Sequence, residues 1–330
     1  MILNSCSNEL DVLGDYEENA AVYGLLDPRD GVQLIKINKV FTNPNAKASD
    51  VAQISDSLFF DTLSPELVEL ETGRRIPLFR ANILLKDSGF FINSPNYLYA
   101  TTERVYANNP NNVNQLFNYR LEFKLPKTGK LISVTTNMVR NFNIQSPFNN
   151  ALPFIPRTVN FIPNSNFQLR FSSPVNGKIF DAYFNFNYIE VNKLDTNVKE
   201  FKTIRWKILR SYRTASIKGG ELISSITPGI NFYNLLVEDI KANPTIFRRF
   251  AAASLEIYAG NLELDNYIQA STPSIGIVQK QTDYTNINNG GVGIFASRNT
   301  LFLDGITLAD FTKNLIVFDE KYKYLGFVKD

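Results

Sequence analysis

The stretch FDAYFNFNYI, residues 180–189, places Phe, Ala, Phe, Phe and Tyr at every second position, with mostly polar residues between them. A period of two residues is typical of a β-strand with one buried face. Residues 199–212 follow as a partner segment that contains Trp206, the only tryptophan of the chain. We therefore predict two long strands that face one another in the second half of the protein.

The first half of the chain contains shorter segments with the same two-residue alternation of apolar and polar residues. A turn with Pro and Gly divides residues 21–41 into two strand-like segments, which predicts a hairpin. Further hairpins are predicted at 67–79, where Pro77 favours a sheet edge, and at 119–138. Closely spaced short strands predict an immunoglobulin/fibronectin-III-like or transthyretin-like β-sandwich over residues 20–140. The Cys…Trp…Cys pattern of a true immunoglobulin domain is absent.

A second domain follows a segment that has no periodicity. The segment is rich in Asn, Pro and Phe, and we place a linker at 141–157. Residues 158–330 are then expected to form a second β-rich domain with one or two helices, at 231–242 and 262–269. The expected fold class is therefore mainly β.

Local signals refine this second domain. Asn231 is the expected N-cap of the first helix, and Pro244 follows its end. Asn-Gly within residues 174–177 predicts a type I′ hairpin turn, because these residues accept positive φ angles. The remaining strands are expected at 294–295, 300–303, 315–318 and 324–328.

Composition excludes several kinds of chemistry. The chain has 330 residues, no histidine and one cysteine. Ser-His-Asp and Cys-His catalysis, histidine-ligated metals, intrachain disulfides, thiolate zinc sites and iron–sulfur clusters are therefore excluded. A formal net charge of +2 gives no strong global field for nucleic acid. We expect no cofactor and no nucleic-acid partner.

The single cysteine predicts where in the cell the protein is located. Cys6 follows Leu3, Asn4 and Ser5, which fit a lipobox with an aliphatic residue three before the cysteine and a small residue directly before it. A diacylglycerol on the thiol and further acylation would give stable anchoring. The alternative is a cytoplasmic protein with an ordinary free thiol near its terminus.

Residues 1–19 are interpreted as this lipobox and an acidic tether. A basic n-region and most of an apolar h-region are missing, so Met1 is interpreted as a start inside a longer signal peptide or a boundary of the expressed sequence. The polar, acidic residues after Cys6 resemble the signal that sends some Bacteroidota lipoproteins to the outer face of the outer membrane. Whether the protein faces the cell surface or the periplasm stays open.

Three groups of residues are candidates for binding or chemistry. A tyrosine cluster flanks an Asn-rich loop at 108–114, and ring faces together with amides are what sugar-binding surfaces use; its members are Tyr97, Tyr99, Tyr106 and Tyr119. Alternating oxygen donors before a Gly-Gly turn form a weak cation candidate, for which a structural turn is the stronger interpretation: Asp283, Asn286 and Asn288.

A hydrolase without histidine would need two carboxylates. Four acids lie in strand-like segments, Asp181, Glu190, Glu256 and Glu122, and none belongs to a recognisable catalytic motif. Strand alternation places several of these acids on the solvent side, so we expect that they do not converge on one pocket. A carboxylate-based glycoside hydrolase is therefore kept only as an alternative to a non-enzyme.

Several stretches, taken in order, resemble a family of Bacteroidota outer-membrane lipoproteins that carry a domain of unknown function. They are Cys6 with its tether, VYGLLD at 22–27 with IKINK at 35–39, YRL at 119–121 with TTNMV at 135–139, YAGNLEL at 258–264 with YI at 267–268, and YTNINNGGVGIFASR at 284–298. The resemblance implies a lipid-anchored, mostly β, two-domain protein. It also implies an accessory role beside TonB-dependent receptors, and it implies no catalytic residue.

We therefore expect a non-enzymatic lipid-anchored protein of the outer membrane or cell surface that binds or scaffolds a partner. The partners expected are the membrane itself, an outer-membrane protein and a glycan. A glycan-binding or glycan-cleaving surface protein is one alternative, and a structural or adhesion protein of the cell surface is another.

Overall fold

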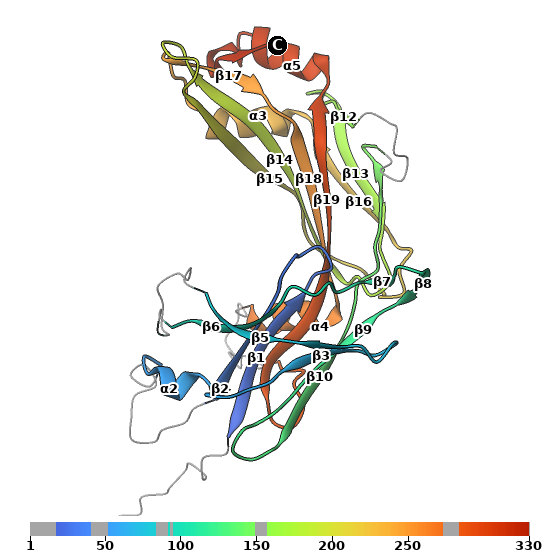
Figure 1. Cartoon of the computed structure of the whole chain (residues 1–330). Helices are drawn as coiled ribbons and strands as arrows, with labels where there is room; N and C mark the ends of the chain where they lie inside the picture. Colours follow the sequence, from blue (N-terminus) through green and yellow to red (C-terminus); the bar gives the residue numbers. More distant parts are fainter. Residues whose placement is uncertain are drawn as a thin grey trace, which may run out of the picture.

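The computed structural model describes residues 18–40, 52–83, 92, 95–148, 157–272 and 284–329. These residues form an elongated molecule with two lobes joined end to end (Figure 1). The lower lobe in that view contains most of the first half of the chain, and the upper lobe most of the second half. Within the described residues, no helix is both long and apolar enough to cross a membrane.

The N-terminal lobe contains two sheets around one core. One sheet is ordered β1 (Asn19–Leu26), β2 (Gln33–Val40), β6 (Tyr97–Thr101) and β5 (Phe79–Asn82). The other is ordered β10 (Leu131–Asn137), β9 (Asn118–Lys124), β3 (Glu66–Glu69) and β4 (Arg75–Pro77). The short helix α2 (Ser55–Leu58) and a ribbon of β7 (Asn108–Asn109) and β8 (Asn112–Leu116) complete the lobe.

The three predicted hairpins of this lobe are confirmed. Antiparallel pairs join β1 with β2, β3 with β4, and β9 with β10. Pro77 lies in β4, an edge strand, which needs no donor at that position. Val22 and Ile35 of the first sheet share a buried core with Leu121 and Val134 of the second. Two sheets over one core make a β-sandwich-like lobe, as predicted.

The C-terminal lobe is built on the long strands that the period of two predicted. β14 (Ile179–Asn192) pairs with β15 (Lys199–Arg213) over almost its whole length, and with β17 (Ile246–Phe250) and β18 (Ala253–Gly260) on its other edge. The short strand β20 (Phe327–Val328) extends this sheet beyond β17. The facing sheet contains β11 (Ile144–Ser146), β13 (Asn166–Ser172) and β16 (Leu222–Pro228).

The alternation within 180–189 has the expected result. Phe180, Phe184 and Phe186 are fully buried, whereas Asp181 and Tyr183 lie half-buried on the opposite face of the sheet. Phe232 of α3 (Ile230–Asp239) packs into the same core. This core is strongly aromatic, and burial of such rings contributes most of the stabilisation of a lobe of this size.

Several predictions about the second half are corrected by the structure. Residues 315–318 lie in helix α5 (Asp310–Phe318) rather than a strand, because a short apolar run does not by itself distinguish the two. With α3 and α4 (Leu262–Ser271), the described second half has three α-helices rather than one or two. The 3₁₀ turn η1 (Lys323–Leu325) follows α5. Gly229, not Asn231, is the N-cap of α3.

The turn at 174–177 is not a hairpin. β13 pairs with β11 and β16, whereas β14 pairs with other strands, so the turn carries the chain from one sheet to the other. Asn176 has the positive φ of 66° that the Asn-Gly signal suggests. Its amide donates to the backbone oxygen of Met138, so the turn is fixed by a contact with the junction of the lobes.

One strand belongs to both lobes. The first half of β19 (Val292–Leu308) runs parallel to β1, and its second half runs antiparallel to β18 (Figure 1). Gly293 is required at the close approach to β1, since a Cβ there would lie 2.1 Å from the backbone oxygen of Val22. Phe295 consequently packs in the N-terminal core.

The predicted domain limits are therefore corrected at two places. Residues 284–297 were assigned to the second domain by their position in the chain, but Ile287 and Phe295 contribute to the core of the first. Parallel pairing between distant segments leaves no local signal in the sequence. Of the predicted linker 141–157, Ile144 and Phe148 lie in the C-terminal core. Residues 149–156 of that linker lie outside the described residues.

Candidate functional site

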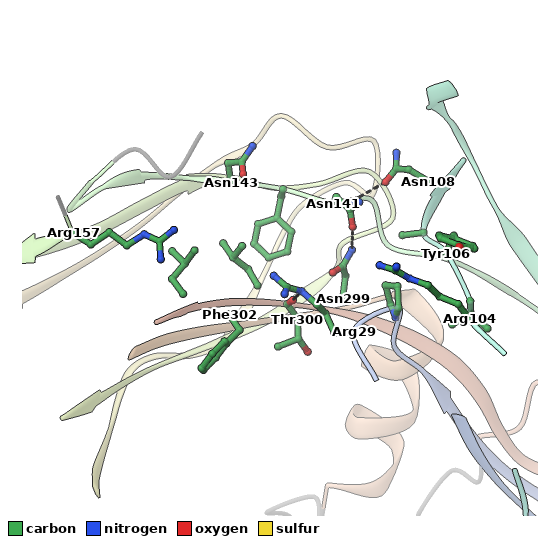
Figure 2. Close-up of a pocket in the computed structure, with 16 residues that line it drawn as sticks. Arg29, Arg104, Tyr106, Asn108, Asn141, Asn143, Arg157, Asn299, Thr300 and Phe302 are labelled. Carbon is green, nitrogen blue, oxygen red and sulfur yellow. Dashed lines mark hydrogen bonds between the residues drawn. The ribbon is translucent and has the colours of Figure 1, made fainter. Parts of the chain in front are cut away.

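A cleft opens beside β19 where the two lobes meet. On one edge, β19 pairs with β1 up to Ser297 and with β12 (Thr158–Val159) from Thr307 onward. No other described strand pairs with this edge between those two points. The cleft has a volume of about 480 Å³ at this gap, within the range of roughly 300–1,000 Å³ usual for ligand sites (Figure 2).

Three arginines from separate parts of the chain line this cleft. Arg29 follows β1, Arg104 precedes β7, and Arg157 precedes β12. Figure 2 shows Arg157 at one end of the cleft, Arg104 with Tyr106 at the other, and Arg29 between them. None of the residues that line the cleft in the described part of the chain is an aspartate or glutamate. The cleft is therefore positively charged although the whole chain is nearly neutral.

Two of these guanidiniums have no acidic partner among the described residues. Arg29 donates through Nε to the backbone oxygen of Thr300 at 3.0 Å and forms no ion pair. Arg104 lies 5.1 Å from the ring centroid of Tyr106 and likewise forms no ion pair. Arg157 reaches Asp304 Oδ1 at 3.5 Å, but that carboxylate is 78% exposed, so the attraction is weak.

A chain of amides fixes one wall of the cleft. Asn299 Nδ2 donates to Asn141 Oδ1 at 2.8 Å and to the backbone oxygen of Val139 at 3.0 Å. The backbone N–H of Asn141 donates to Asn108 Oδ1 at 3.0 Å. These bonds connect β19, the crossing between the lobes and the β7–β8 ribbon, so the wall is held in place before any ligand arrives.

Aromatic side chains supply the apolar surface of the cleft. Phe142 and Tyr106 are half-buried and line the cleft. Phe302 of β19 lies only at the rim, because its 43% exposed ring is on the other face of the sheet, where Phe302 is opposite Glu256 of β18 (Figure 2). Guanidiniums, amides and partly exposed rings in one cleft can bind an anionic or a polyhydroxylated molecule.

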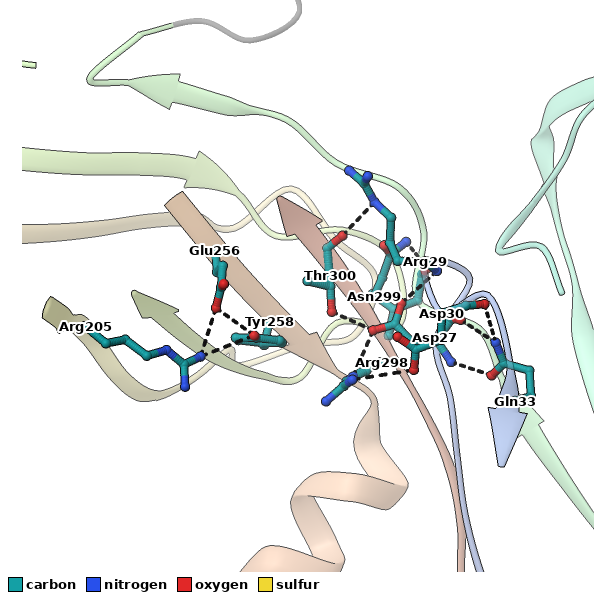
Figure 3. A network of polar contacts seen from close by, with 11 residues as sticks. Asp27, Arg29, Asp30, Gln33, Arg205, Glu256, Tyr258, Arg298, Asn299 and Thr300 are labelled. Atoms are coloured by element: carbon teal, nitrogen blue, oxygen red, sulfur yellow. Dashed lines mark hydrogen bonds and ion pairs between the residues drawn. The ribbon is translucent and has the colours of Figure 1, made fainter. Parts of the chain in front are cut away.

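The neighbouring face of the junction, which we call the paired face, also carries arginines, but these are neutralised (Figure 3). Asp27 is fully buried and accepts from Arg298 Nε at 2.8 Å and from the hydroxyl of Thr300. Its other oxygen accepts from the backbone N–H of Arg29. Arg298 also approaches Asp30, at 3.6 Å.

Acidic partners continue across the sheet on this paired face. Arg205 pairs with Glu256 at 2.9 Å and lies 3.8 Å from the ring centroid of Tyr183. Tyr258 donates to Glu256 at 2.7 Å, and burial together with this bond raises the pKa of Tyr258. Lys207 pairs with Asp181 at 2.8 Å. The charged side chains of this face are therefore paired with one another, and these pairs stabilise the fold.

The four predicted tyrosines have different surroundings. Tyr99 is only 2% exposed and Tyr119 is fully buried, so neither ring offers a face to a sugar, which corrects the prediction for both. Tyr119 donates to Glu69 Oε2 at 2.8 Å and accepts from the backbone N–H of Tyr106, and burial holds its pKa well above the usual value. Both tyrosines lie on the face of their strand that points into the core, and the local sequence does not specify which face that is.

The other two tyrosines are partly exposed. Tyr97 packs edge-on against Phe59, and the guanidinium of Arg80 lies 3.6 Å from its ring centroid. This contact is away from the cleft, which Tyr97 does not line. Tyr106 is the one predicted tyrosine that lines the cleft, together with Asn108 from the predicted Asn-rich loop.

In the part of the weak cation candidate that the structure describes, the asparagines form hydrogen bonds that stabilise the turn. Asn286 Oδ1 accepts from the backbone N–H of Phe295 at 3.0 Å, and its amide donates to the oxygen of the same residue at 2.8 Å. The backbone oxygen of Asn288 accepts from Gly291 within the turn. Asp283 lies outside the described residues, and within them no group of three or more Cys, Asp or Glu side chains could hold a metal.

The four candidate carboxylates are bound to cations. Glu190 pairs with the buried Arg248 at 2.7 Å. Glu122 lies in the other lobe; burial alone would raise its pKa, but hydrogen bonds from Arg120 and Arg75 hold it below its usual value. Asp181 and Glu256 share the paired face, each with its own cation. A general acid needs a raised pKa, so these environments do not favour acid catalysis.

Sequence reasoning missed the arginines and Asn299 because they lie far apart in the chain. The only local signal was the concentration of Asn and aromatic residues at 104–114 and 140–156. Cys6, the predicted lipidation site, lies outside the described residues.

No protein-family model matches the chain, and a search of curated proteins finds no match.

Proposed function

We propose that this chain is a non-enzymatic, lipid-anchored protein of the outer membrane or cell surface that binds a partner through the cleft between its lobes. The cleft is the observation that carries the proposal. It is preformed, it contains Arg29 and Arg104 without acidic partners among the described residues, and it has half-buried rings in Tyr106 and Phe142.

The anchor rests on the sequence. Leu3 and Ser5 before Cys6 fit the lipobox, and an acidic tether follows. The resemblance to Bacteroidota lipoproteins supports an accessory role in TonB-dependent uptake. A catalytic role has little support, because each of the four acids considered is paired with a cation.

Glycan binding is the second candidate function, and one observation favours it. Tyr106 and Asn108 line the cleft together with Asn141 and Phe142. Rings that stack on sugar C–H groups and amides that bond hydroxyls are the usual elements of a sugar site. A glycan is therefore the second candidate for the partner that binds in the cleft.

The anchor is tested in cells that express the gene from its native locus. Wild type is expected in the membrane fraction with an acyl mass on the N-terminal peptide, and Cys6→Ser is expected in the soluble fraction. A wild-type protein without lipid in intact-mass analysis would contradict the anchor.

The cleft is tested by a photo-crosslinking amino acid placed in intact cells at position 106, with position 201 as the control. Phe201 is an exposed aromatic residue of β15, away from the cleft. We expect a specific adduct from position 106 and none from 201. Equal adducts from both positions, or none from 106, would overturn the cleft as the binding site.

A further inference from the structure

We infer that the cleft binds an acidic oligosaccharide, whose sugar rings carry carboxylate or sulfate groups. This inference rests on the proposed binding function and names the chemical class of its ligand. It is carried by three features of the cleft, namely its uncompensated guanidiniums, its shortage of acceptors and its partly exposed rings.

The first feature is charge. Arg29, Arg104 and Arg157 line one cleft, and only Arg157 contacts a carboxylate among the described residues. The planar guanidinium presents paired donors that match the two oxygens of a carboxylate or sulfate. Like charges gathered in a cleft repel one another, so an anion bound there relieves an unfavourable interaction and adds hydrogen bonds.

The second feature is the balance of donors and acceptors. The side-chain oxygens of Asn108 and Asn141 already accept hydrogen bonds within the wall. A neutral sugar presents many hydroxyl donors, which need acceptors, and no carboxylate lines the described cleft. The arginines offer donors only. An acceptor-rich ligand therefore fits better than a neutral one.

The third feature separates a sugar from a bare anion and from a peptide. Phe142 and Tyr106 offer apolar surface that an inorganic anion cannot use. An extended peptide added to the open edge of β19 would need the backbone oxygens along that edge. Arg29 already occupies the oxygen of Thr300, in the middle of the gap, so a continuous ladder of hydrogen bonds is interrupted.

The test is calorimetric titration of the purified protein. The probes are tetragalacturonate, its full methyl ester as an uncharged counterpart, a chondroitin sulfate tetrasaccharide and inorganic phosphate. We expect at least one acidic tetrasaccharide to bind, the ester to bind at least tenfold more weakly, and phosphate to show no saturable binding. Affinity should fall as the salt concentration rises, because ion pairing is screened.

Variants assign the binding to the cleft. Arg29→Gln and Arg104→Gln should each weaken binding about tenfold, the value of a lost charge-assisted hydrogen bond. Arg210→Gln makes the same change at an exposed position of β15 that does not line the cleft, and should leave affinity unchanged. Equal unfolding curves of the three variants establish that the fold is intact.

The possible failures are distinguishable. Equal binding of the ester overturns the acidic ligand but leaves the cleft as a sugar site. Tighter binding of phosphate than of either acidic sugar, or binding of a polyglutamate peptide alone, also overturns the inference. If neither acidic sugar binds while position 106 still forms adducts in cells, the ligand class is wrong and the proposed function stands. If position 106 forms none, the cleft itself is wrong.

Discussion

The two sides of the junction carry the same residue types with opposite consequences. On the paired face, Arg298 and Arg205 contact Asp27 and Glu256 at 2.8 and 2.9 Å. In the cleft, Arg29 and Arg104 have no such partner among the described residues. Both sides use the same strand, β19. The difference teaches that an arginine marks a binding site here only where its charge is left without compensation.

The largest effect is expected at Asp27, which connects the two sides. Asp27→Ala leaves Arg298 without its main partner, frees the hydroxyl of Thr300 and releases the backbone of Arg29. Breaking a pair that contains a buried carboxylate costs about 3 kcal/mol. Urea unfolding should show this loss, and crosslinking from position 106 should weaken as the cleft loosens.

Asp30→Ala is the matched control for that experiment. Asp30 is more exposed and lies 3.6 Å from the same arginine, so its loss should cost well under 1 kcal/mol. A similar loss in both variants would mean that Asp27 is not the central contact of the junction.

A smaller loss is expected where the cleft is supported from the core. Tyr119→Phe removes the hydroxyl that links Glu69 with the backbone of Tyr106. The N–H of Tyr106 and Glu69 Oε2 then lose their bonds, while Glu69 Oε1 keeps the hydroxyl of Thr72. Leaving buried polar groups unsatisfied costs about 2 kcal/mol. Tyr106→Phe, which changes only a half-buried ring of the cleft, should stay within about 0.5 kcal/mol of wild type in the same assay.

The contrast between the paired face and the cleft is tested by one arginine substitution on each of them. Arg205→Gln removes the partner of Glu256 and should destabilise the protein by about 1 kcal/mol. Arg104→Gln should change stability by less than about 0.5 kcal/mol, because no ion pair is lost. If Arg104→Gln destabilises as much as Arg205→Gln, the cleft arginines are structural.

The smallest effect concerns alkaline pH on the paired face. Burial and the bond to Glu256 raise the pKa of Tyr258 above that of an unfolded tyrosine, about 10. The resulting stabilisation is complete below about pH 10 and is lost as pH rises through the folded-state pKa. Between about pH 9 and 11, Tyr258→Phe should therefore lose less unfolding free energy than wild type. If both proteins lose the same unfolding free energy over this range, the pH dependence does not arise from Tyr258.

Much of the fold could be predicted because its signals are local. The alternation at 180–189 and the turn residues of three hairpins specify strands directly, and the structure shows them. The helix at 310–318 was missed because a four-residue apolar run fits either structure. The Asn-Gly turn at 174–177 was misjudged because its conformation does not reveal which strands will pair.

The candidate site was predicted only in fragments. Of the predicted tyrosines, Tyr106 lines the cleft, whereas Tyr99 and Tyr119 are buried. Arg29, Arg157 and Asn299 carried no signal at all, since nothing in their local sequence distinguishes them from other solvated or strand residues.

Composition and short-range periodicity are enough to specify the mainly β class and the excluded chemistries, and the residues before Cys6 predict a lipobox. The pairing of β19 with β1, the position of Arg29 beside Thr300 and the open edge between the lobes follow from tertiary contacts alone. Such long-range pairing depends on the packing of whole sheets. The charge balance that separates the cleft from the paired face follows from that packing.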